Sequence, residues 1–151
     1  MPGTWEPFGP TRRLTEPSDQ VPRADAAPAA APVAIPARRE PARRLAIITC
    51  MDARIDPLAV LGLRLGDANV IRNAGATVSD DVLRSLRAAE SVLGVRHAVL
   101  IGHTDCAGHG SDEATRSALV DGARRIRGAT PDAFVVEALM YDVATGALDP
   151  L

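Results

Sequence analysis

The apolar run LAIIT at residues 45–49 constrains the fold of this chain most strongly. It does not alternate polar with apolar residues, and this pattern predicts a strand that is buried on both faces. Such strands are typical of parallel sheets that carry helices on both sides. The run therefore predicts a domain of the α/β class.

Short apolar runs and amphipathic stretches alternate in the residues that follow. Pro57 is expected to open a short helix, which ends near Gly62 or Gly66. Ser79 and Ser111 suit the caps of two longer helices. Strands alternating with helices predict a mostly parallel central β-sheet flanked by helices. Further strands are expected at residues 69–72, 97–101 and 134–143, the last followed by a turn at 144–146, and the longer helices are expected to end at Gly94 and Gly128.

Proline content separates an N-terminal arm from this domain. Residues 1–42 hold nine of the twelve prolines, together with the run AAPAAAP at residues 26–32. Proline lacks an amide donor and interrupts helices and sheets alike. We therefore expect a flexible arm over residues 1–42 and one folded domain over residues 43–151.

Charge and hydropathy argue against several classes of partner. The formal net charge of −2 at pH 7 gives no support for nucleic-acid binding. No apolar run approaches the roughly 18 to 20 residues that cross a bilayer, so no membrane partner is expected. The pair Arg12-Arg13 is not followed by a continuous apolar segment, which argues against an export signal. We expect a cytoplasmic protein with reduced cysteines.

Reactive side chains follow the ends of two predicted strands. Cys50 ends the first strand and precedes Asp52 and Arg54, in the sequence CMDAR. His103 and Cys106 follow the strand at 97–101, in the sequence GHTDC. In open parallel sheets, ligands gather where the carboxyl ends of strands meet a reversal of strand order. If these two strands are neighbours, Cys50 and His103 converge, and the pair is a candidate site.

Two thiols and one imidazole make a ligand set that suits zinc. Cys50, His103 and Cys106 offer the sulfur and nitrogen atoms that Zn²⁺ binds in tetrahedral geometry, and they leave a fourth position open, as in catalytic sites. The residues alone also allow a structural zinc site, a disulfide or two buried thiols. Asp52 and Arg54 alone fit a local ion pair or a helix cap.

The other two histidines carry weaker signals. His109 lies three positions after Cys106, and an unperturbed pKa of about 6.5 suits a proton relay. The alternative is a loop histidine in solvent. His97 begins a predicted strand and is expected to be structural.

These motifs together resemble the β-class carbonic anhydrases. CMDAR at residues 50–54 and HTDC at 103–106 are similar to the family's signature. RNAG at 72–75 and YDVATG at 141–146 are similar to a loop and to the last core strand of the family. The resemblance covers residues 45–106 closely and then residues 134–148. It implies a short member of the family.

The resemblance implies a role for each candidate residue. Cys50, His103 and Cys106 would bind Zn²⁺, and Asp52 and Arg54 would form the catalytic dyad. In a closed state of the family, Asp52 would become the fourth ligand. The implied reaction is the reversible hydration of carbon dioxide to bicarbonate and a proton by zinc-bound hydroxide, and the implied assembly is a homodimer or a higher homo-oligomer.

Three alternatives keep some of these residues and change the function. A relative on the same fold would hydrolyse carbon disulfide or carbonyl sulfide at the same metal. A non-catalytic remnant of the family would bind zinc without turnover. A thiol redox protein would pair Cys50 with Cys106 and hold no zinc.

The chain departs from the family pattern after the second cysteine. Ala107 stands where the family commonly has glycine, and a positive φ there would cost alanine about 1 kcal/mol. The segment 107–133 is also shorter than in the short members of the family, by about one helix. A shorter segment provides fewer residues to enclose the site.

Overall fold

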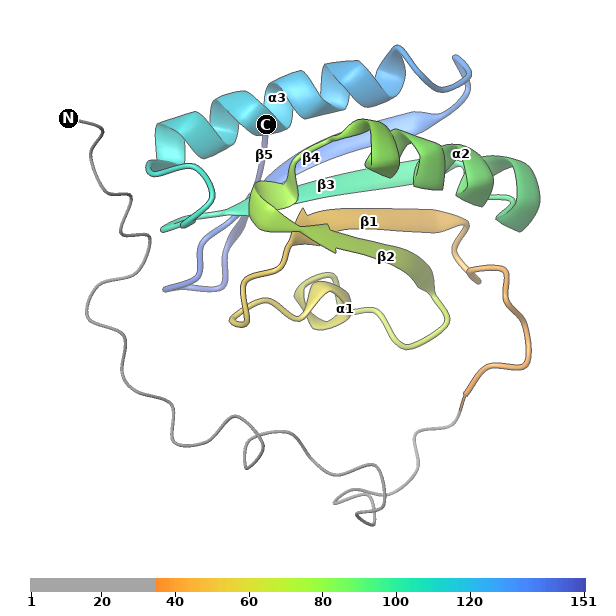
Figure 1. Cartoon of the computed structure of the whole chain (residues 1–151). Coiled ribbons are helices and arrows are strands. Elements are labelled where there is room, and N and C mark those ends of the chain that lie inside the picture. The colour runs from red at the N-terminus through yellow and green to blue at the C-terminus, as the bar shows by residue number, and fades with distance from the viewer. Residues whose placement is uncertain (1–34) are drawn as a thin grey trace, which may run out of the picture. The chain divides into compact units, whose positions relative to one another are not determined.

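A sheet of five strands forms the centre of residues 35–151, the part of the chain that this computed structural model describes (Figure 1). The strands are β1 (Leu45–Cys50), β2 (Ala68–Asn73), β3 (His97–His103), β4 (Val135–Tyr141) and β5 (Leu148–Pro150). Their order across the sheet is β2-β1-β3-β4-β5. The first four strands are parallel and β5 is antiparallel to β4, which confirms the predicted α/β class with a mostly parallel sheet.

Helices cover both faces of this sheet (Figure 1). They are α1 (Pro57–Val60), α2 (Asp80–Leu93), α3 (Asp112–Arg127) and a short 3-10 helix, η2 (Ala74–Ala76). In Figure 1, α2 and α3 lie on one face and α1 on the other. Within residues 35–151, no helix is long and apolar enough to cross a membrane.

Both long helices begin and end where the sequence predicts. The hydroxyl of Ser79 accepts a hydrogen bond from the backbone N–H of Val82 at 3.3 Å, and Ser111 caps α3 in the same way. Each cap satisfies an amide that has no partner inside the helix. Gly94 ends α2 at a φ of 71°, a left-handed conformation that glycine adopts without strain.

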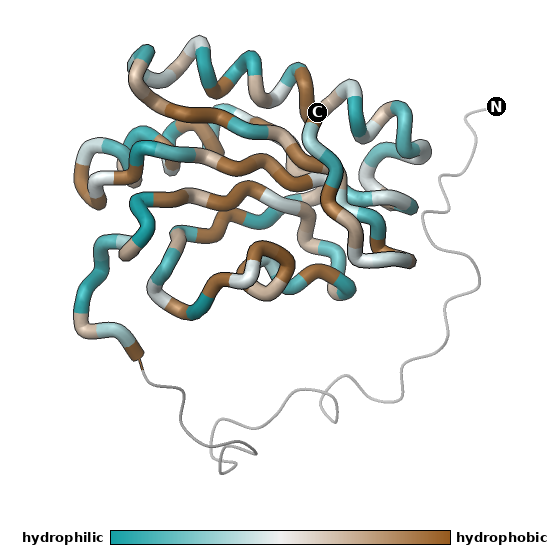
Figure 2. Tube along the Cα trace, turned by 180° about the vertical axis from the view of Figure 1, so that it is seen from behind, coloured by the Kyte–Doolittle hydropathy of each residue, from teal (hydrophilic) through white to brown (hydrophobic). Residues whose placement is uncertain are grey.

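The apolar residues of β1 alternate between two cores. Ala46 and Ile48 face α2 and α3, whereas Leu45 and Ile47 face the side of α1. All four are buried, as a strand covered on both faces requires. Figure 2 shows the hydrophobic residues concentrated along the strands, with hydrophilic residues on the outer turns of the helices. The larger core also contains Val82, Leu86, Leu100, Leu119, Ile126 and Met140.

The chain departs from the predicted elements after β4. This strand ends at Tyr141 because the N–H of Asp142 donates to the carbonyl of Ala147 at 2.9 Å and opens a tight turn. The carboxylate of Asp142 also accepts the N–H of Ala144 at 2.8 Å. The turn leads into β5, an edge strand that the sequence did not reveal. Three residues carry too little periodicity for detection, and one of them is Pro150, a residue that sheets accept mainly at their edges.

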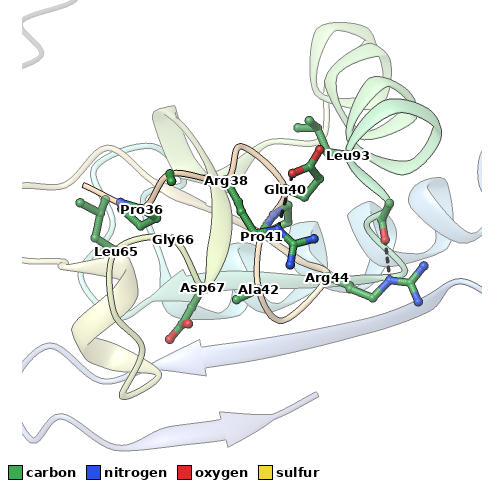
Figure 3. Close-up of a pocket in the computed structure, with 12 residues that line it drawn as sticks. Pro36, Arg38, Glu40, Pro41, Ala42, Arg44, Leu65, Gly66, Asp67 and Leu93 are labelled. Carbon is green, nitrogen blue, oxygen red and sulfur yellow. Dashed lines mark hydrogen bonds and ion pairs between the residues drawn. The ribbon is translucent and has the colours of Figure 1, made fainter. Parts of the chain in front are cut away.

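Residues 35–42 are the described part of the predicted arm, and residues 1–34 lie outside the described residues. The N–H of Ala42 donates to the carbonyl of Gly66 at 2.9 Å, just before β2. Pro36, Leu65 and Leu93 contribute to a pocket of about 630 Å³ at this place (Figure 3). The pocket lies at the amino-terminal ends of β1 and β2, and the reactive side chains lie at the other end of the sheet.

The contact between α3 and β3 is close enough to exclude a methyl group at Gly102. An added Cβ there would lie 2.6 Å from Leu119 Cδ1 and 2.9 Å from Thr115 Cγ2, and both residues are buried. We expect Gly102→Ala to lower the free energy of unfolding by about 1 to 3 kcal/mol, the usual cost of overpacking. Chemical denaturation measures this loss.

Gly128→Ala is the matched control for that substitution. Gly128 lies after α3 with a φ of −71°, and its nearest neighbour would be 3.6 Å from an added Cβ. This variant should be close to the parent protein in stability. A Gly102→Ala protein as stable as the control would contradict the close packing of α3 on β3.

Candidate metal centre

The carboxyl ends of β1 and β3 lie side by side and carry the reactive residues. β1 pairs with β2 on one side and with β3 on the other, so the chain reverses its direction of travel across the sheet at β1. This is the kind of switch point at which open α/β sheets bind ligands. Cys50 is the last residue of β1, and His103 is the last residue of β3.

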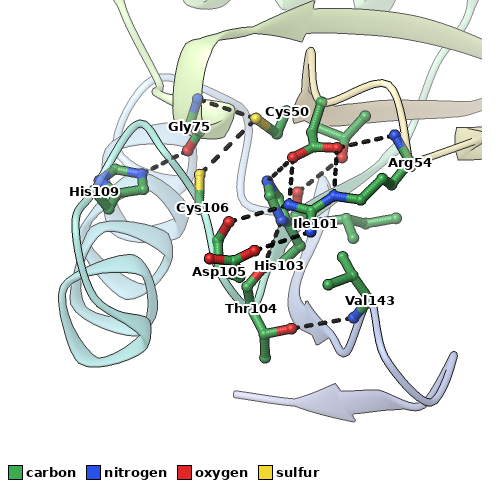
Figure 4. A network of polar contacts seen from close by, with 12 residues as sticks. Cys50, Arg54, Gly75, Ile101, His103, Thr104, Asp105, Cys106, His109 and Val143 are labelled. Carbon is green, nitrogen blue, oxygen red and sulfur yellow. Dashed lines mark hydrogen bonds and ion pairs between the residues drawn. The ribbon is translucent and has the colours of Figure 1, made fainter. Parts of the chain in front are cut away.

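Three ligand-type atoms converge at this switch point (Figure 4). The Sγ atoms of Cys50 and Cys106 are 3.9 Å apart, and these atoms and a ring nitrogen of His103 all lie within 4.8 Å of one another. Two sulfurs that each lie about 2.3 Å from one tetrahedral ion are separated by about 3.8 Å. All three residues are buried, and both cysteines are free thiols.

The ring of His103 is oriented by one hydrogen bond. Its Nδ1 lies 2.8 Å from the carbonyl oxygen of Thr104, which can only accept, so Nδ1 carries the proton. Nε2 then has a free lone pair. This atom is buried and has no hydrogen-bond partner among the described residues. A buried polar atom without a partner is costly, and a metal ion at the Cys–His–Cys group would satisfy it.

The thiols are shielded from solvent. Burial raises the pKa of the Cys106 thiol, and the nearby Cys50 raises it further. A metal cation has the opposite effect, because it binds the thiolate form. Binding of a metal ion at this group would therefore release a proton from the Cys106 thiol.

Gly75 brings the backbone close to Cys50. Its N–H points at Cys50 Sγ at 3.4 Å, and its φ is 70°. His109 contacts the carbonyl group of the same glycine, since its Nε2 lies 2.7 Å from the carbonyl oxygen of Gly75 (Figure 4). A Cβ on Gly75 would lie only 2.6 Å from that nitrogen. Steric hindrance by His109 and the positive φ therefore explain why the RNAG sequence has glycine at this position.

Asp52 and Arg54 form a bidentate ion pair next to the three ligand-type atoms. Arg54 Nε donates to Asp52 Oδ1 at 3.0 Å, and Nη2 donates to Oδ2 at 2.7 Å. The backbone N–H of Arg54 also donates to Oδ1 at 2.9 Å. Asp52 Oδ2 lies 3.9 Å from His103 Nε2, so the carboxylate reaches the ligand group without touching it.

This pair stays ionised over the neutral pH range. The hydrogen bonds from Arg54 hold the pKa of the Asp52 carboxyl well below its usual range, and the same pair raises the pKa of Arg54. A carboxyl with a lowered folded-state pKa stabilises the fold at pH values above about 3.9. That stabilisation is lost only as the pH falls through the folded-state pKa. Asp52 is therefore a permanent hydrogen-bond acceptor near pH 7.

Arg72 holds the backbone that carries Cys50 and Asp52. Its Nε donates to the carbonyl of Cys50 at 3.0 Å, and its Nη2 donates to the carbonyl of Asp52 at 2.7 Å. The sequence showed Arg72 only as part of the RNAG resemblance. Its contacts depend on β2 lying beside β1, and no local pattern predicts which carbonyl a long side chain will reach.

A cleft of about 680 Å³ opens beside the dyad. Asp52, Arg54 and Cys106 lie in its lining, together with two acidic residues, Asp105 and Asp112, that sequence reasoning missed. Ser111, a helix cap, lines it as well. The cleft therefore opens to solvent beside Asp52 and Arg54, and the buried Cys106 lies in its wall.

The structure also shows the surroundings of the other two histidines and of Ala107. His97 Nε2 lies 2.8 Å from Glu137 Oε2 at the start of β3, far from the thiols, which agrees with a structural role. His109 supports Gly75 and is not among the residues that line the cleft. Ala107 has no positive φ, so alanine carries no strain there. The non-glycine residue with a positive φ in this loop is Asp105, with a φ of 54°.

Fold and site define an α/β protein with a buried Cys–His–Cys group, suited to a metal, at the carboxyl ends of a parallel sheet. A family model described as carbonic anhydrase matches residues 45–128. The chain belongs to the β-class carbonic anhydrase family, as the resemblance of its motifs predicted.

Individual relatives agree with this assignment. The β-carbonic anhydrase 1 of Mycobacterium tuberculosis is 52% identical over 66 residues, which are 44% of this chain and 40% of that protein. A carbon disulfide hydrolase of Saccharolobus solfataricus is 45% identical over 64 residues, which are 42% of this chain and 31% of that protein. A solved carbonic anhydrase from Streptococcus mutans matches with a TM-score of 0.68 at 31% identity, covering 74% of this chain and 82% of that one.

The mycobacterial protein and the carbon disulfide hydrolase are each longer than the segment that matches this chain. The matched residues span 40% of the mycobacterial protein and 31% of the carbon disulfide hydrolase. The residues that the family model matches, 45–128, include the Cys–His–Cys group, Asp52 and Arg54. Family membership is thus established by the region that forms the site.

Proposed function

We propose that this protein catalyses the reversible hydration of carbon dioxide to bicarbonate and a proton, with Zn²⁺ held by Cys50, His103 and Cys106. One observation carries the proposal. A buried imidazole nitrogen that has no hydrogen-bond partner within residues 35–151 faces two thiols, directly beside a carboxylate that Arg54 holds ionised. A closed structural site has no need of an oriented carboxylate at its edge.

The donor set supports zinc in particular. Two sulfurs and one imidazole nitrogen suit Zn²⁺, and three protein ligands leave a position for a water. When bound, Zn²⁺ supplies a water whose pKa falls to about 7, against about 15.7 for bulk water. Mg²⁺ and Ca²⁺ prefer oxygen ligands, which this group does not offer.

Asp52 orients the reacting water in this proposal. An ionised carboxylate can only accept hydrogen bonds, so a water beside it must donate its proton towards Asp52. The lone pair of the water then points away from Asp52 and towards the carbon of the substrate. Arg54 occupies both carboxylate oxygens and fixes their direction. In the closed state that the family resemblance implies, Asp52 would leave Arg54 and join the metal.

Stopped-flow hydration of carbon dioxide tests the proposal directly. We expect zinc-loaded protein to accelerate hydration above the buffer rate between pH 7 and 9, and the metal-free protein to lose that acceleration. Reloading with Zn²⁺ should restore it, whereas Mg²⁺ should not. Stoichiometric zinc with no hydration in this range would instead support a non-catalytic zinc-binding member of the family.

The second candidate is hydrolysis of carbon disulfide or carbonyl sulfide by the same residues. The 45% identity to a carbon disulfide hydrolase is the observation that favours it. Both reactions start with attack of an oriented water on the central carbon of a linear molecule. Hydrogen sulfide release from carbon disulfide, measured beside carbon dioxide hydration on one preparation, separates the two.

We also propose that the protein is a homodimer or a larger homo-oligomer in the cytoplasm. The support is the implied assembly of the family, together with exposed apolar side chains on two strands of the sheet. Val70 on β2 is 40% exposed, and Val135 on β4 is 51% exposed. Light scattering on the full chain measures the mass of the assembly, and a monomer at micromolar concentration would contradict this proposal.

A further inference from the structure

The guanidinium of Arg54 contacts a second acidic residue besides Asp52. Its Nη1, which Asp52 leaves free, donates to Asp105 Oδ2 at 3.0 Å (Figure 4). Its Nη2 also donates to the backbone carbonyl of Asp105 at 3.1 Å. With Asp52 on one edge and Asp105 on the other, all three nitrogens of the guanidinium have acceptors.

Asp105 is held in an unusual backbone conformation. Its φ of 54° lies in the left-handed region, which non-glycine residues adopt rarely, Asp and Asn more often than most. The carboxylate of Asp112, the first residue of α3, accepts the N–H of Asp105 at 2.9 Å. This conformation allows both the carbonyl and the side chain of Asp105 to reach Arg54.

Asp105 lies in the chain between two of the three ligand-type residues. Asp105 lies between His103 and Cys106, whereas Arg54 belongs to the loop after β1. The contact between Arg54 and Asp105 is therefore a link between the two loops that build the site. An exposed ion pair contributes little to stability, and the Asp105 side chain is 82% exposed. The expected effect of the Arg54–Asp105 pair is on the orientation of the Arg54 side chain.

We propose that Asp105 is a positioning residue that fixes the orientation of Arg54 and, through it, the direction of the Asp52 carboxylate. The proposal rests on the proposed function for its effect on catalysis. Without the Asp105 carboxylate, Arg54 Nη1 loses its acceptor and the carboxylate of Asp52 becomes the only side chain that holds the guanidinium among the described residues, so the direction of the Asp52 oxygens is less firmly fixed. Asp112 acts one step further out, by holding the backbone of Asp105.

Two substitutions at position 105 separate the side chain from the backbone. Asp105→Gly removes the carboxylate, and glycine adopts the positive φ without strain. Asp105→Asn removes only the charge, and asparagine also accepts a left-handed conformation. Asp121→Asn is the matched control, because Asp121 is an exposed carboxylate that pairs with Arg124 at 3.0 Å, outside the site.

Nuclear magnetic resonance of the Arg54 guanidinium gives a readout that needs neither metal nor turnover. Protein labelled with ¹⁵N-arginine shows separate Nη signals where rotation is restricted, and the Arg54 signals are those missing from Arg54→Lys. We expect resolved Arg54 signals in the parent and in Asp121→Asn, and averaged signals in Asp105→Gly. Resolved signals in Asp105→Gly would overturn the proposal.

A double-mutant cycle then tests whether Asp105 acts through Arg54. We expect Asp105→Gly to lower kcat/KM about tenfold, with a smaller loss for Asp105→Asn, as for displacement of a positioned group. In an Arg54→Ala background, the same change should have less than about a twofold effect. An equal loss in both backgrounds would overturn the proposal. If the parent has no hydration activity, the proposed function fails and the resonance experiment alone decides the role of Asp105.

Discussion

Cys106→Ala is expected to abolish stoichiometric zinc binding and hydration activity together. Cys106 provides one of the two sulfurs, and the remaining Cys50 and His103 cannot by themselves complete a tetrahedral site. Loss of a residue that merely supports a ligand costs about 10- to 100-fold in metal affinity, so loss of a ligand should cost more than about 100-fold. Metal analysis of dialysed protein and a competition titration with a coloured chelator measure the two quantities.

Ala107→Gly is the control for that experiment. It changes the neighbour of Cys106 to the residue that the family commonly has, and position 107 has no positive φ that would favour glycine. We expect this variant to keep one zinc per chain. A full complement of zinc in Cys106→Ala would contradict the ligand assignment.

Counting free thiols in the parent protein tests the redox alternative. The two sulfur atoms are 3.9 Å apart, well beyond the length of about 2.05 Å of a disulfide bond. We therefore expect two free thiols per chain after zinc is removed under reducing conditions, and zinc-protected thiols before removal. One disulfide and no zinc in freshly purified protein would favour the thiol redox interpretation.

Asp52→Asn is expected to keep zinc and to lose most of the hydration activity. The amide that replaces the carboxylate is neutral and can donate, so it no longer forces the water to present its lone pair to the substrate. The loss in kcat should be about 100-fold or more, the usual range for a positioned acid or base group. Stopped-flow rates and metal analysis on one preparation give both values.

The pH dependence of this variant offers an independent check. The pKa of Asp52 lies far below neutral pH, so Asp52 does not titrate between pH 6 and 9. The midpoint of the rate profile in that range should therefore persist in Asp52→Asn at a lower plateau. Asp121→Asn should retain both the plateau and the midpoint. A full rate in Asp52→Asn would remove Asp52 from the mechanism.

The central part of the fold could be predicted because its signals are local. The run at residues 45–49 has the pattern of a strand covered on both faces, and Ser79 and Ser111 have the chemistry of helix caps. Convergence of Cys50 and His103 followed from one assumption, that β1 and β3 are neighbours. The sheet order confirms that assumption.

The supporting residues of the site could not be predicted in the same way. Arg72 reaches backbone carbonyls of a neighbouring strand, and every residue offers such a carbonyl. Asp105 is recognisable only through its left-handed backbone and its contact with Arg54, 51 positions earlier in the chain. β5 depends on the turn at Asp142 for its place beside β4. These features are properties of the assembled structure, and the sequence around each residue does not encode them.

The separation of the ligand-type residues along the chain has a consequence for folding kinetics. Cys50 and His103 are 53 positions apart, and they become neighbours only when β1 pairs with β3, which closes a loop that contains β2 and α2. Contacts of such long range form late, because loop closure precedes them. An ion that binds only the finished site therefore acts mainly by slowing unfolding, and it does little to speed the search for the fold. The lifetime of the native state, more than its rate of formation, is what the metal would control.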